Sequence, residues 1–284
     1  MRRAPTLIRR ILLLILALIV THGCQRTSPK SPGARASGHD APQNGQELRV
    51  FAASSLTESF QEIARAFEKA HPEVNITLHF AGSQALRTQI ENGAPADVFA
   101  SANPAHLDAL LIAKLLQTPS IFAYNRLVIV TPAQNPASIE SVQTLPHARR
   151  LVVGSAEVPI GRYTRQFLQR AADSFGDDYR EEVERDIVSH EANVRLILTK
   201  VAMGEADAGI VYHTDARVRG DQVRTVAIPA NLNIRADYPI AVTTGSENPV
   251  LARRWVEFVR SSQGQKILAA RGFDTATPIL EQPP

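Results

Sequence analysis

The sequence predicts an α/β fold in which short apolar strands alternate with amphipathic helices. Residues 74–80 alternate apolar and polar side chains, which is typical of a strand. Just before them, one helical face is apolar at i, i+4, i+7, i+8 and i+11, and its members are Leu56, Phe60, Ile63, Ala64 and Phe67. Strands that alternate with helices of this length form βαβ units, so we expect mostly parallel sheets flanked by helices.

The remaining elements follow from the same two periodicities and from turn residues. Asn92-Gly93 and Pro95 end one predicted helix, and Pro104 begins the next. The predicted strands are residues 48–53, 74–80, 97–101, 126–131, 151–154, 187–190, 208–212 and 238–244. The other predicted helices are residues 85–91, 162–172, 193–203, 249–261 and 263–270, besides the one that begins at 104. The sequence contains no internal repeat that we can recognise.

The amino terminus indicates where the protein works. Four arginines precede an unbroken run of ten apolar residues, Ile11 to Val20. A helix that spans a bilayer needs about 20 such residues, so the run is typical of a signal peptide rather than a membrane anchor.

The signal segment ends at the only cysteine of the chain. Thr21-His22-Gly23-Cys24 resembles a bacterial lipobox, although Leu is more usual than Thr at its first position. Residues 1–23 are therefore predicted to be a lipoprotein signal peptide, with Cys24 carrying lipid. Ordinary cleavage, leaving Cys24 as a free thiol, is the alternative. Residues 24–46 are rich in Ser, Pro, Gly, Gln and Asn and are predicted to be a flexible tether. We expect an extracytoplasmic, membrane-anchored protein, periplasmic in a Gram-negative cell.

Charge and cysteine content exclude several classes of protein. Residues 1–23 carry four arginines and no acid, so the formal net charge of +3 becomes −1 once they are removed. The basic balance therefore belongs to the targeting segment and does not indicate a nucleic-acid partner. A single cysteine allows no internal disulfide and no cysteine-rich metal site. About 235 residues remain, enough for one large domain or for two lobes.

Two serines lie where a predicted strand gives way to a helix. Ser55 and Ser83 each place a hydroxyl and free backbone N–H groups at a helix N-terminus, which is an anion site built without lysine or arginine. The plainer interpretation is structural. Ser55 and Glu58 fit the S-x-x-E pattern of a capping box, and Ser83 could be a simple cap or turn residue.

Three further positions also lie at the start of a predicted helix or at the end of a predicted strand. Gly161 lies in a run, 158–163, that enters a helix, and Asn193 begins another helix. Tyr212 ends the strand 208–212. Taken singly, these are a connection, an N-cap and a core tyrosine. Together they place helix N-termini and hydroxyls at the carboxyl ends of strands, where open α/β sheets bind ligands.

At this point the chain resembles a known family. The runs 51–57, 93–99, 158–163 and 209–212 resemble the molybdate-binding proteins of bacterial ABC transporters, with matching order and spacing over about residues 47–275. In that family two serines, two backbone amides and a tyrosine hydroxyl hold a tetrahedral oxyanion. The resemblance implies that the corresponding groups here are the hydroxyls of Ser55, Ser83 and Tyr212 and the amides of Ile160 and Val194.

This sequence departs from the family at the edges of the implied site. Ile160 stands where a smaller residue, often Ala, is usual, and Gly82 and Gln84 flank Ser83 where many members have Ser. A backbone donor survives a change of side chain, whereas the size of the pocket need not.

The resemblance also implies an architecture and partners. It implies a two-lobed periplasmic-binding-protein fold, with residues 47–125 and 234–284 in lobe 1 and residues 126–233 in lobe 2. Hinge strands would cross near Tyr124-Asn125 and return within 234–238, and the lobes would close on the ligand. It further implies a monomer that needs no cofactor, is not an enzyme, and delivers molybdate or tungstate to an ABC permease with its ATPase.

The chemistry of the implied site favours a dianion without a proton. Each helix N-terminus presents about +0.5 charge, so four of them supply about +2. None of the five positions is a carboxylate, so no strong acceptor waits for a proton on the ligand. This argues against hydrogen phosphate and suits molybdate, tungstate or sulfate. The metal would enter as an oxyanion and not as a bare cation.

Other functions remain open at this stage. Ser55 with His190 or His213 could be imagined as a hydrolase, but the sequence has no G-x-S-x-G elbow. A binding protein for sulfate, ferric ion or a small organic anion is a second alternative. A sensory or adhesive lipoprotein that uses the fold without transport is a third.

Overall fold

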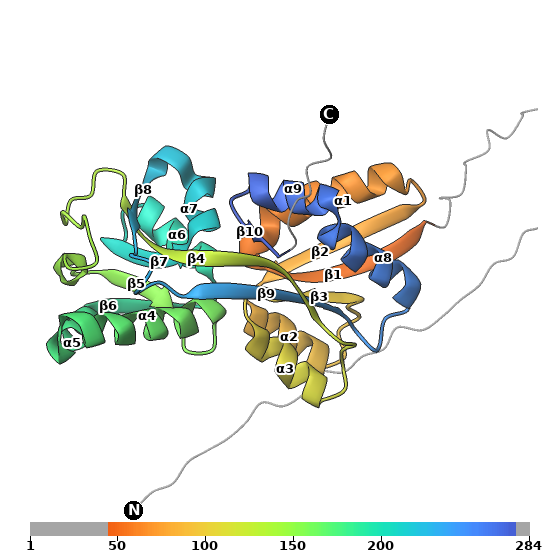
Figure 1. Ribbon diagram of the computed structural model, residues 1–284, viewed down its shortest axis with the longest axis horizontal. Helices are drawn as coiled ribbons and strands as arrows, with labels where there is room; N and C mark the ends of the chain where they lie inside the picture. Colours follow the sequence, from red (N-terminus) through yellow and green to blue (C-terminus); the bar gives the residue numbers. More distant parts are fainter. Residues whose placement is uncertain (1–44, 277–284) are drawn as a thin grey trace, which may run out of the picture. The chain divides into compact units, whose positions relative to one another are not determined.

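The computed structural model describes residues 45–276 (Figure 1). The predicted signal peptide, the lipidation site at Cys24 and nearly all of the predicted tether lie outside the described residues. Within residues 45–276, no helix is both long and apolar enough to cross a membrane.

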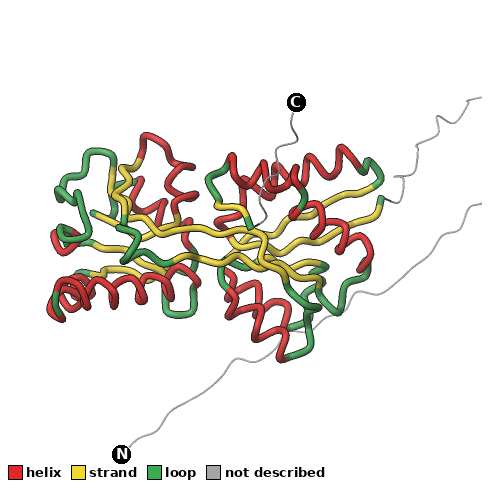
Figure 2. The backbone as a smooth tube through the Cα atoms, in the orientation of Figure 1, coloured by secondary structure: helices red, strands yellow, loops and turns green. Residues whose placement is uncertain are grey.

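Helices and strands alternate along the described chain, as the sequence predicted (Figure 2). The helices are α1 Thr57–Ala70, α2 Ser83–Glu91, α3 Pro104–Ile112, α4 Pro159–Phe175, α5 Asp177–Arg185, α6 Val194–Ala202, α7 His213–Arg219, α8 Pro249–Arg260 and α9 Ser262–Ala270. The strands are β1 Gln46–Ala53, β2 Val74–Ala81, β3 Val98–Ala100, β4 Ser120–Pro132, β5 Leu151–Gly154, β6 Ile187–Glu191, β7 Ala208–Tyr212, β8 Val223–Ala227, β9 Arg235–Val242 and β10 Asp274–Thr275. Short 3-10 turns cover Ser54–Leu56, Leu145–His147 and Gly220–Gln222.

The sheet consists of two parallel groups connected by two antiparallel strands. β1 pairs in parallel with β2 and β3, and β5 pairs in parallel with β6 and β7. β9 runs antiparallel to β3 and β4, and β4 runs antiparallel to β7, β8 and β10. The predicted α/β class is confirmed, but the expectation of mostly parallel sheets holds only inside each group. Below, the first lobe means β1–β3, α1–α3, α8 and α9, and the second lobe means β5–β8 and α4–α7.

β4 is long enough to belong to both groups. Its residues 120–126 pair with β9, and its residues 127–132 pair with β7 and β8. Where β4 and β9 run together, the Arg235 guanidinium lies 4.4 Å from the centre of the Tyr124 ring. These are the segments predicted to be hinge strands; the limits of the lobes and the hinge motion remain predictions.

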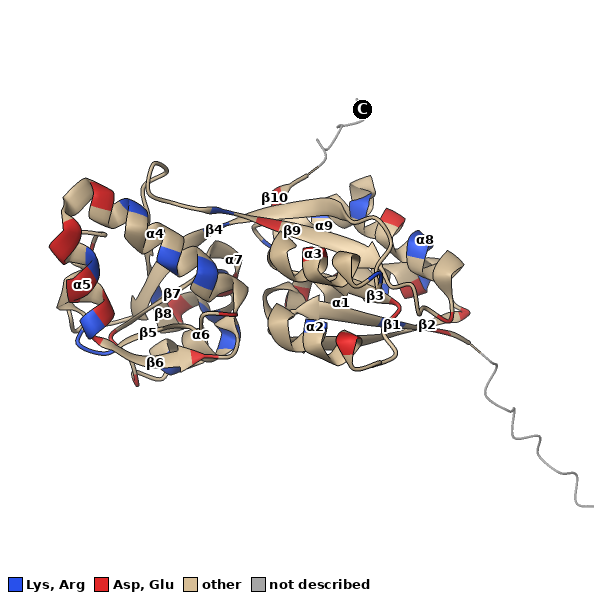
Figure 3. Cartoon of the chain, turned by 90° about the horizontal axis from the view of Figure 1, so that it is seen from below, with Lys and Arg blue, Asp and Glu red and all other residues tan. Residues whose placement is uncertain are grey.

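Some elements were not predicted because their patterns are weak. The sequence analysis placed the start of β4 at 126, six residues after it begins, and did not identify α5, α7 or β8. In α5 only Tyr179 and Val183 are buried, too few to produce a helical stripe. Figure 3 shows acidic and basic residues mixed along its exposed surface.

The predicted apolar stripes form the cores. Leu56, Phe60, Ile63 and Phe67 are all buried against the first lobe's sheet. Trp255 packs edge to face against Phe60 and Phe67. Each such aromatic pair stabilises the fold by about 0.5–1.5 kcal/mol beyond the contribution of the apolar area that it buries. In the second lobe the α6 stripe of Val194, Ile197, Leu198 and Val201 is likewise buried. These packed helices hold their N-termini in place at the ends of the strands.

Candidate functional site

All five residues implied by the sequence line one cavity. The cavity and the solvent at its mouth together occupy about 200 Å³ of space outside the atoms, and the wall comes from both lobes. The lining residues are Ala53, Ser54, Ser55, Ala81, Gly82, Ser83, Ala102, Val158, Pro159, Ile160, Asn193, Val194 and Tyr212. This lining has no charged side chain, so polarity comes from hydroxyls, one side-chain amide and the backbone.

Ser55 lies in the 3-10 turn between β1 and α1, and it is not a helix cap. Leu56 occupies the N-cap position of α1, where no side chain accepts a hydrogen bond. The predicted capping box is therefore wrong, because the extra turn moves Ser55 away from the first turn of the helix. The Oγ atom of Ser55 instead lies 2.9 Å from the Oη atom of Tyr238. The predicted partner in the box, Glu58, pairs with Arg195 of the second lobe.

Ser83 is the first residue of α2, directly after Gly82 at the N-cap. Its side chain is 1% exposed, and its Oγ atom accepts a hydrogen bond of 3.1 Å from the Ala102 N–H. That bond leaves the Ser83 proton free to be donated into the cavity. The neighbouring Gly82 is needed for close approach, because a Cβ atom there would lie 2.4 Å from the carbonyl oxygen of Ala192 in the second lobe.

The second lobe contributes the N-termini of α4 and α6. At α6 the Asn193 side chain accepts from the N–H groups of Arg195 and Leu196, as its predicted role as an N-cap requires. Capping therefore satisfies the second and third amides and leaves the first, that of Val194, free to meet a ligand. An anion at this position is favoured by the helix dipole as well.

The α4 terminus is built by a close contact between helix and strand. The helix begins at Pro159, three residues before the predicted start, so Ile160 lies in its first turn. Proline has no N–H, and the Ile160 amide is the first one that α4 can present. A Cβ atom at Gly161 would lie 2.1 Å from the Ser155 carbonyl oxygen, so only glycine allows the helix to approach β5 this closely.

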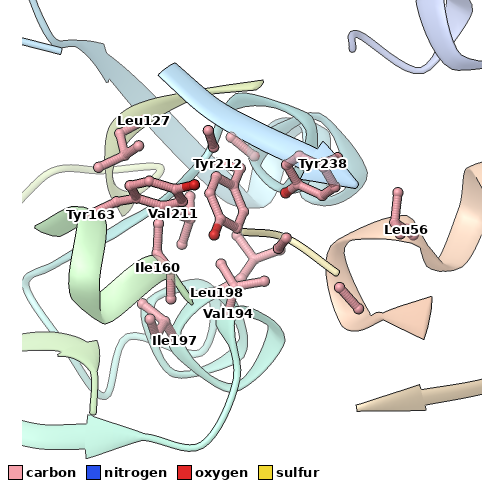
Figure 4. Close-up of a cluster of buried hydrophobic side chains, with 14 of the residues drawn as sticks. Leu56, Leu127, Ile160, Tyr163, Val194, Ile197, Leu198, Val211, Tyr212 and Tyr238 are labelled. Carbon is pink, nitrogen blue, oxygen red and sulfur yellow. The ribbon is translucent and has the colours of Figure 1, made fainter. Parts of the chain in front are cut away.

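Tyr212 ends β7 and carries the most informative atom in the site. Its side chain is 1% exposed, and its hydroxyl has no hydrogen-bond partner among the described residues. Figure 4 shows its ring between those of Tyr163 and Tyr238, with the hydroxyl on the side of Ile160 and Val194. Burial raises the pKa of the Tyr212 phenol well above its usual value, so the group is a neutral donor at pH 7. A buried hydroxyl without a partner is available to donate to a bound anion.

Tyr238 is a site residue that sequence reasoning missed. It lies on β9, is fully buried, and reaches Ser55 across 183 positions of sequence. The sequence analysis identified it only as the start of a strand and the end of a predicted hinge. No local signal could have paired it with Ser55, because their contact depends on the pairing of β9 with β3 and β4.

An ion cluster connects the lobes beside the cavity. Arg195 follows Val194, and its Nη1 and Nη2 atoms donate to the Glu58 carboxylate at 2.8 and 2.5 Å. Its Nε atom lies 2.7 Å from Oδ1 of Asp215, which is fully buried. Burial raises the pKa of Asp215 to about 6, against the opposing effect of Arg195. Burial works against the charge on Arg195, but Asp215 and Glu58 outweigh it and raise its pKa.

Two neutral contacts also cross between the lobes. The Nε2 atom of Gln84 donates to the Ala192 carbonyl oxygen at 2.7 Å. The Nε2 atom of His106 lies 2.9 Å from the Glu157 carbonyl oxygen. Burial lowers the pKa of His106 to about 4, so its ring is neutral at pH 7 and Nε2–H is the donor. The residues flanking Ser83 and Ile160 are thus held against the opposite lobe.

A second hollow on the other side of Ser55 is a weaker candidate. Its charged lining residues are Glu58, Arg217 and Arg271. Glu58 pairs with Arg195, Arg271 pairs with Glu62, and Arg217 donates to the Ala270 carbonyl oxygen. The uncharged cavity, with its free donors, is therefore the better candidate for the functional site.

The alternatives based on histidine or a metal cation receive no support from this cavity. Neither His190 nor His213 lines it, although Ser55 does. Residues 45–276 contain no group of three or more His, Cys, Asp or Glu side chains arranged to hold a metal ion.

Comparison with known proteins agrees with this geometry. The family of bacterial extracellular solute-binding proteins matches residues 48–274. The molybdate-binding protein ModA of Mycobacterium tuberculosis is 37% identical over 262 residues, which cover 92% of this chain and 95% of that protein. The periplasmic molybdate-binding protein of Azotobacter vinelandii superimposes with a TM-score of 0.70 at 19% identity, covering 81% and 100% of the two chains.

A sulfate-binding protein superimposes equally well. SubI of Mycobacterium tuberculosis gives a TM-score of 0.72 at 17% identity, covering 82% of this chain and 88% of that one. At such identities both structures show the shared fold alone. The fold therefore does not distinguish molybdate from sulfate, and the argument about ligand rests on the site.

The chain belongs to the family of bacterial extracellular solute-binding proteins. Within this family its relatives include the molybdate-binding proteins, so the predicted resemblance is confirmed. The predicted fold of a periplasmic binding protein is confirmed as well.

Proposed function

We propose that this protein captures molybdate or tungstate outside the cytoplasm and delivers it, chemically unchanged, to the permease of an ABC transporter. The anion would accept hydrogen bonds from the hydroxyls of Ser55, Ser83 and Tyr212 and from the amides of Ile160 and Val194. The protein would act as a monomer, without a cofactor, and the ATPase of the transporter would drive uptake.

The observation that carries this proposal is the unpartnered hydroxyl of Tyr212. It is buried in the cavity that Ser55, Ser83, Ile160 and Val194 also line. An uncharged set of fixed donors suits a dianion that carries no proton, because charge-assisted bonds in a dry site are strong. Tyr212→Phe should weaken molybdate binding by about 1.5–3 kcal/mol and leave the fold intact.

Thermal unfolding with four anions tests the choice of ligand. A ligand at 100 times its dissociation constant adds about 2.7 kcal/mol to the unfolding free energy. We expect molybdate and tungstate to raise the melting temperature strongly at concentrations where sulfate and phosphate do little. Equal stabilisation by sulfate would refute the preference for molybdate.

Closure of two lobes on the anion is part of the proposal. Residues 47–125 and 234–284 would form lobe 1, of which 277–284 lie outside the described residues. Residues 126–233 would form lobe 2, and the segments of β4 and β9 near Asn125 and Ala236 would be the hinge. The proposed donors are divided between the lobes, so the ligand binds the closed state better than an open one. Small-angle scattering should show a smaller radius of gyration with molybdate; an unchanged radius would mean a preformed site.

Anchoring of the protein by lipid on Cys24 is proposed from the sequence. Cys24→Ser should release the protein from the membrane fraction or leave it uncleaved. Unchanged fractionation and mass would leave ordinary signal cleavage as the explanation.

A further inference from the structure

Each serine of the site has a hydrogen-bond partner on the side away from the cavity. The Ser83 Oγ atom accepts from the Ala102 N–H, which is a backbone group and can only donate. The Ser55 Oγ atom instead lies 2.9 Å from the Tyr238 phenol, and either oxygen of that pair could be the donor. The direction of the second bond decides whether Ser55 presents a proton or a lone pair to the cavity.

The chemistry of the two hydroxyls determines that direction. The Tyr238 side chain is fully buried, and burial raises the pKa of its phenol well above the usual value, so the proton stays on. Ser55 Oγ lies 2.9 Å away, and the Asn125 and Tyr212 side chains also interact with this hydroxyl. A phenol is a stronger hydrogen-bond donor and a weaker acceptor than an aliphatic hydroxyl, so the pair is more stable with Tyr238 as the donor. The Ser55 proton is then available to a bound anion.

We propose that Tyr238 is a positioning residue for anion binding, donating its proton to Ser55 Oγ so that the Ser55 proton points into the cavity. This inference rests on the proposed function. The phenol does for Ser55 what the Ala102 amide does for Ser83. The chain from Tyr238 through Ser55 to the anion is a run of hydrogen bonds in one direction, in which each bond polarises the next.

The arrangement also favours one class of anion. Hydrogen phosphate has to donate its own proton, and a serine that already accepts from Tyr238 is a poor acceptor. A fully deprotonated oxyanion has no such proton to place. Tyr238 therefore contributes to selectivity without itself lining the cavity.

A double-mutant cycle between Tyr238 and Ser55 tests the proposal. Calorimetric titration with sodium molybdate would compare the wild type, Tyr238→Phe, Ser55→Ala and the double variant. In the wild-type background Tyr238→Phe should raise the dissociation constant about 10-fold, the effect of one lost hydrogen bond. In the Ser55→Ala background, Tyr238→Phe should change the dissociation constant by less than about 2-fold, because Tyr238 acts through Ser55.

Tyr179→Phe is the matched control. Tyr179 is another buried tyrosine, and it does not line the cavity. Its hydroxyl donates a hydrogen bond of 2.6 Å to the Val142 carbonyl oxygen. Its substitution should lower stability in the same way as Tyr238→Phe and leave molybdate affinity unchanged. A fall in affinity of similar size for Tyr179→Phe would overturn the positioning role.

Selectivity provides a readout that a merely structural role would not move. The ratio of phosphate to molybdate dissociation constants should fall about 10-fold in Tyr238→Phe. An unchanged ratio, or the same loss in both backgrounds of the cycle, would overturn the inference. If the wild type bound none of these anions, the proposed function itself would fail, whereas a wild type that binds and a Tyr238→Phe variant that binds equally well would refute only the role of Tyr238.

Discussion

The two lobes present donors to one cavity in different ways. The first lobe offers the side-chain hydroxyls of Ser55 and Ser83, each oriented by a second group behind it. The second lobe offers the first free amides of α4 and α6, together with the hydroxyl of Tyr212. A single substitution can delete a hydroxyl, whereas a backbone donor persists with every side chain except that of proline.

This difference explains how the second lobe can carry an unexpected side chain at a donor position. Ile160 stands where the resemblance led us to expect a smaller residue, and its amide is still the first that α4 presents. On the first lobe, by contrast, the serines have to be serines. Substitution of a serine in the first lobe should therefore change ligand affinity. Substitution of a side chain at the amide donors of the second lobe should change it little.

The largest effect we predict concerns the link between the lobes. Arg195→Met removes the partner of Glu58 and leaves the Asp215 carboxylate buried and unpaired. Breaking a buried pair in this way costs about 3–5 kcal/mol of unfolding free energy. Urea denaturation at pH 7.5 or above would measure it, since Asp215 is ionised there in the wild type and loss of Arg195 raises its pKa further.

Arg180→Met provides the control for this prediction. Arg180 pairs with Glu184 one turn along α5, an exposed contact that should be worth less than about 0.5 kcal/mol. If Arg195→Met cost no more than Arg180→Met, the cluster would not connect the lobes energetically.

The second prediction concerns pH and the contact made by His106. Its pKa is about 4 in the folded protein and near 6.5 when unfolded, so the unfolded chain takes up the proton first as the pH falls. The contribution of His106 to the unfolding free energy is complete above pH 6.5. As the pH falls from 6.5 to 4, the unfolding free energy decreases by on the order of 3 kcal/mol through this group. The measurement is chemical denaturation from pH 7 to 4.

His106→Gln isolates this effect from the carboxylates that titrate in the same range. Glutamine retains an N–H donor for the Glu157 carbonyl and does not titrate. The variant should lose less stability on acidification than the wild type, and parallel curves for the two proteins would show that His106 is not responsible.

The third prediction separates the two kinds of donor directly. Ser83→Ala deletes a hydroxyl and should weaken molybdate binding by about 1.5–3 kcal/mol. Val194→Pro deletes an N–H at the first position of α6, where proline is tolerated and the extended Asn193 backbone suits it. It should cost as much as Ser83→Ala.

Val194→Ala is its control, because it keeps the amide. Its affinity should stay within about 0.5 kcal/mol of wild type, although it removes buried methyl groups. Equal losses for Val194→Ala and Val194→Pro would assign the effect to packing rather than to the amide.

The smallest effect is predicted at Ile160. Ile160→Ala should change the affinity for molybdate by less than about 0.5 kcal/mol, because the α4 amide is retained. The substitution should still lower the unfolding free energy by about 2–5 kcal/mol, since the side chain is buried. A large change in affinity would show that side-chain volume in the second lobe sets the fit of the ligand.

Much of the architecture could be predicted because it depends on local periodicity. The stripe from Leu56 to Phe67 and the strand 208–212 were located from sequence and occur as α1 and β7. The positions of Ser83 and Asn193 at helix starts were predicted for the same reason. α5 was missed because its buried face consists of two residues, and the first half of β4 because a single strand there changes partners midway.

The sequence by itself determined the fold class, the family and the identities of the proposed donors, because strand and helix periods and short motifs are properties of neighbouring residues. Only the tertiary structure decided what Ser55 does. The sequence offers it as an anion ligand or as a cap paired with Glu58, whereas in the fold its hydroxyl contacts Tyr238 and Glu58 pairs with Arg195. These partners lie 183 and 137 positions away, and the packing of β9 and α6 against the turn after β1 brings them together. Contacts at that separation leave no periodic trace in a sequence, so the orientation of each donor belongs to the fold as a whole.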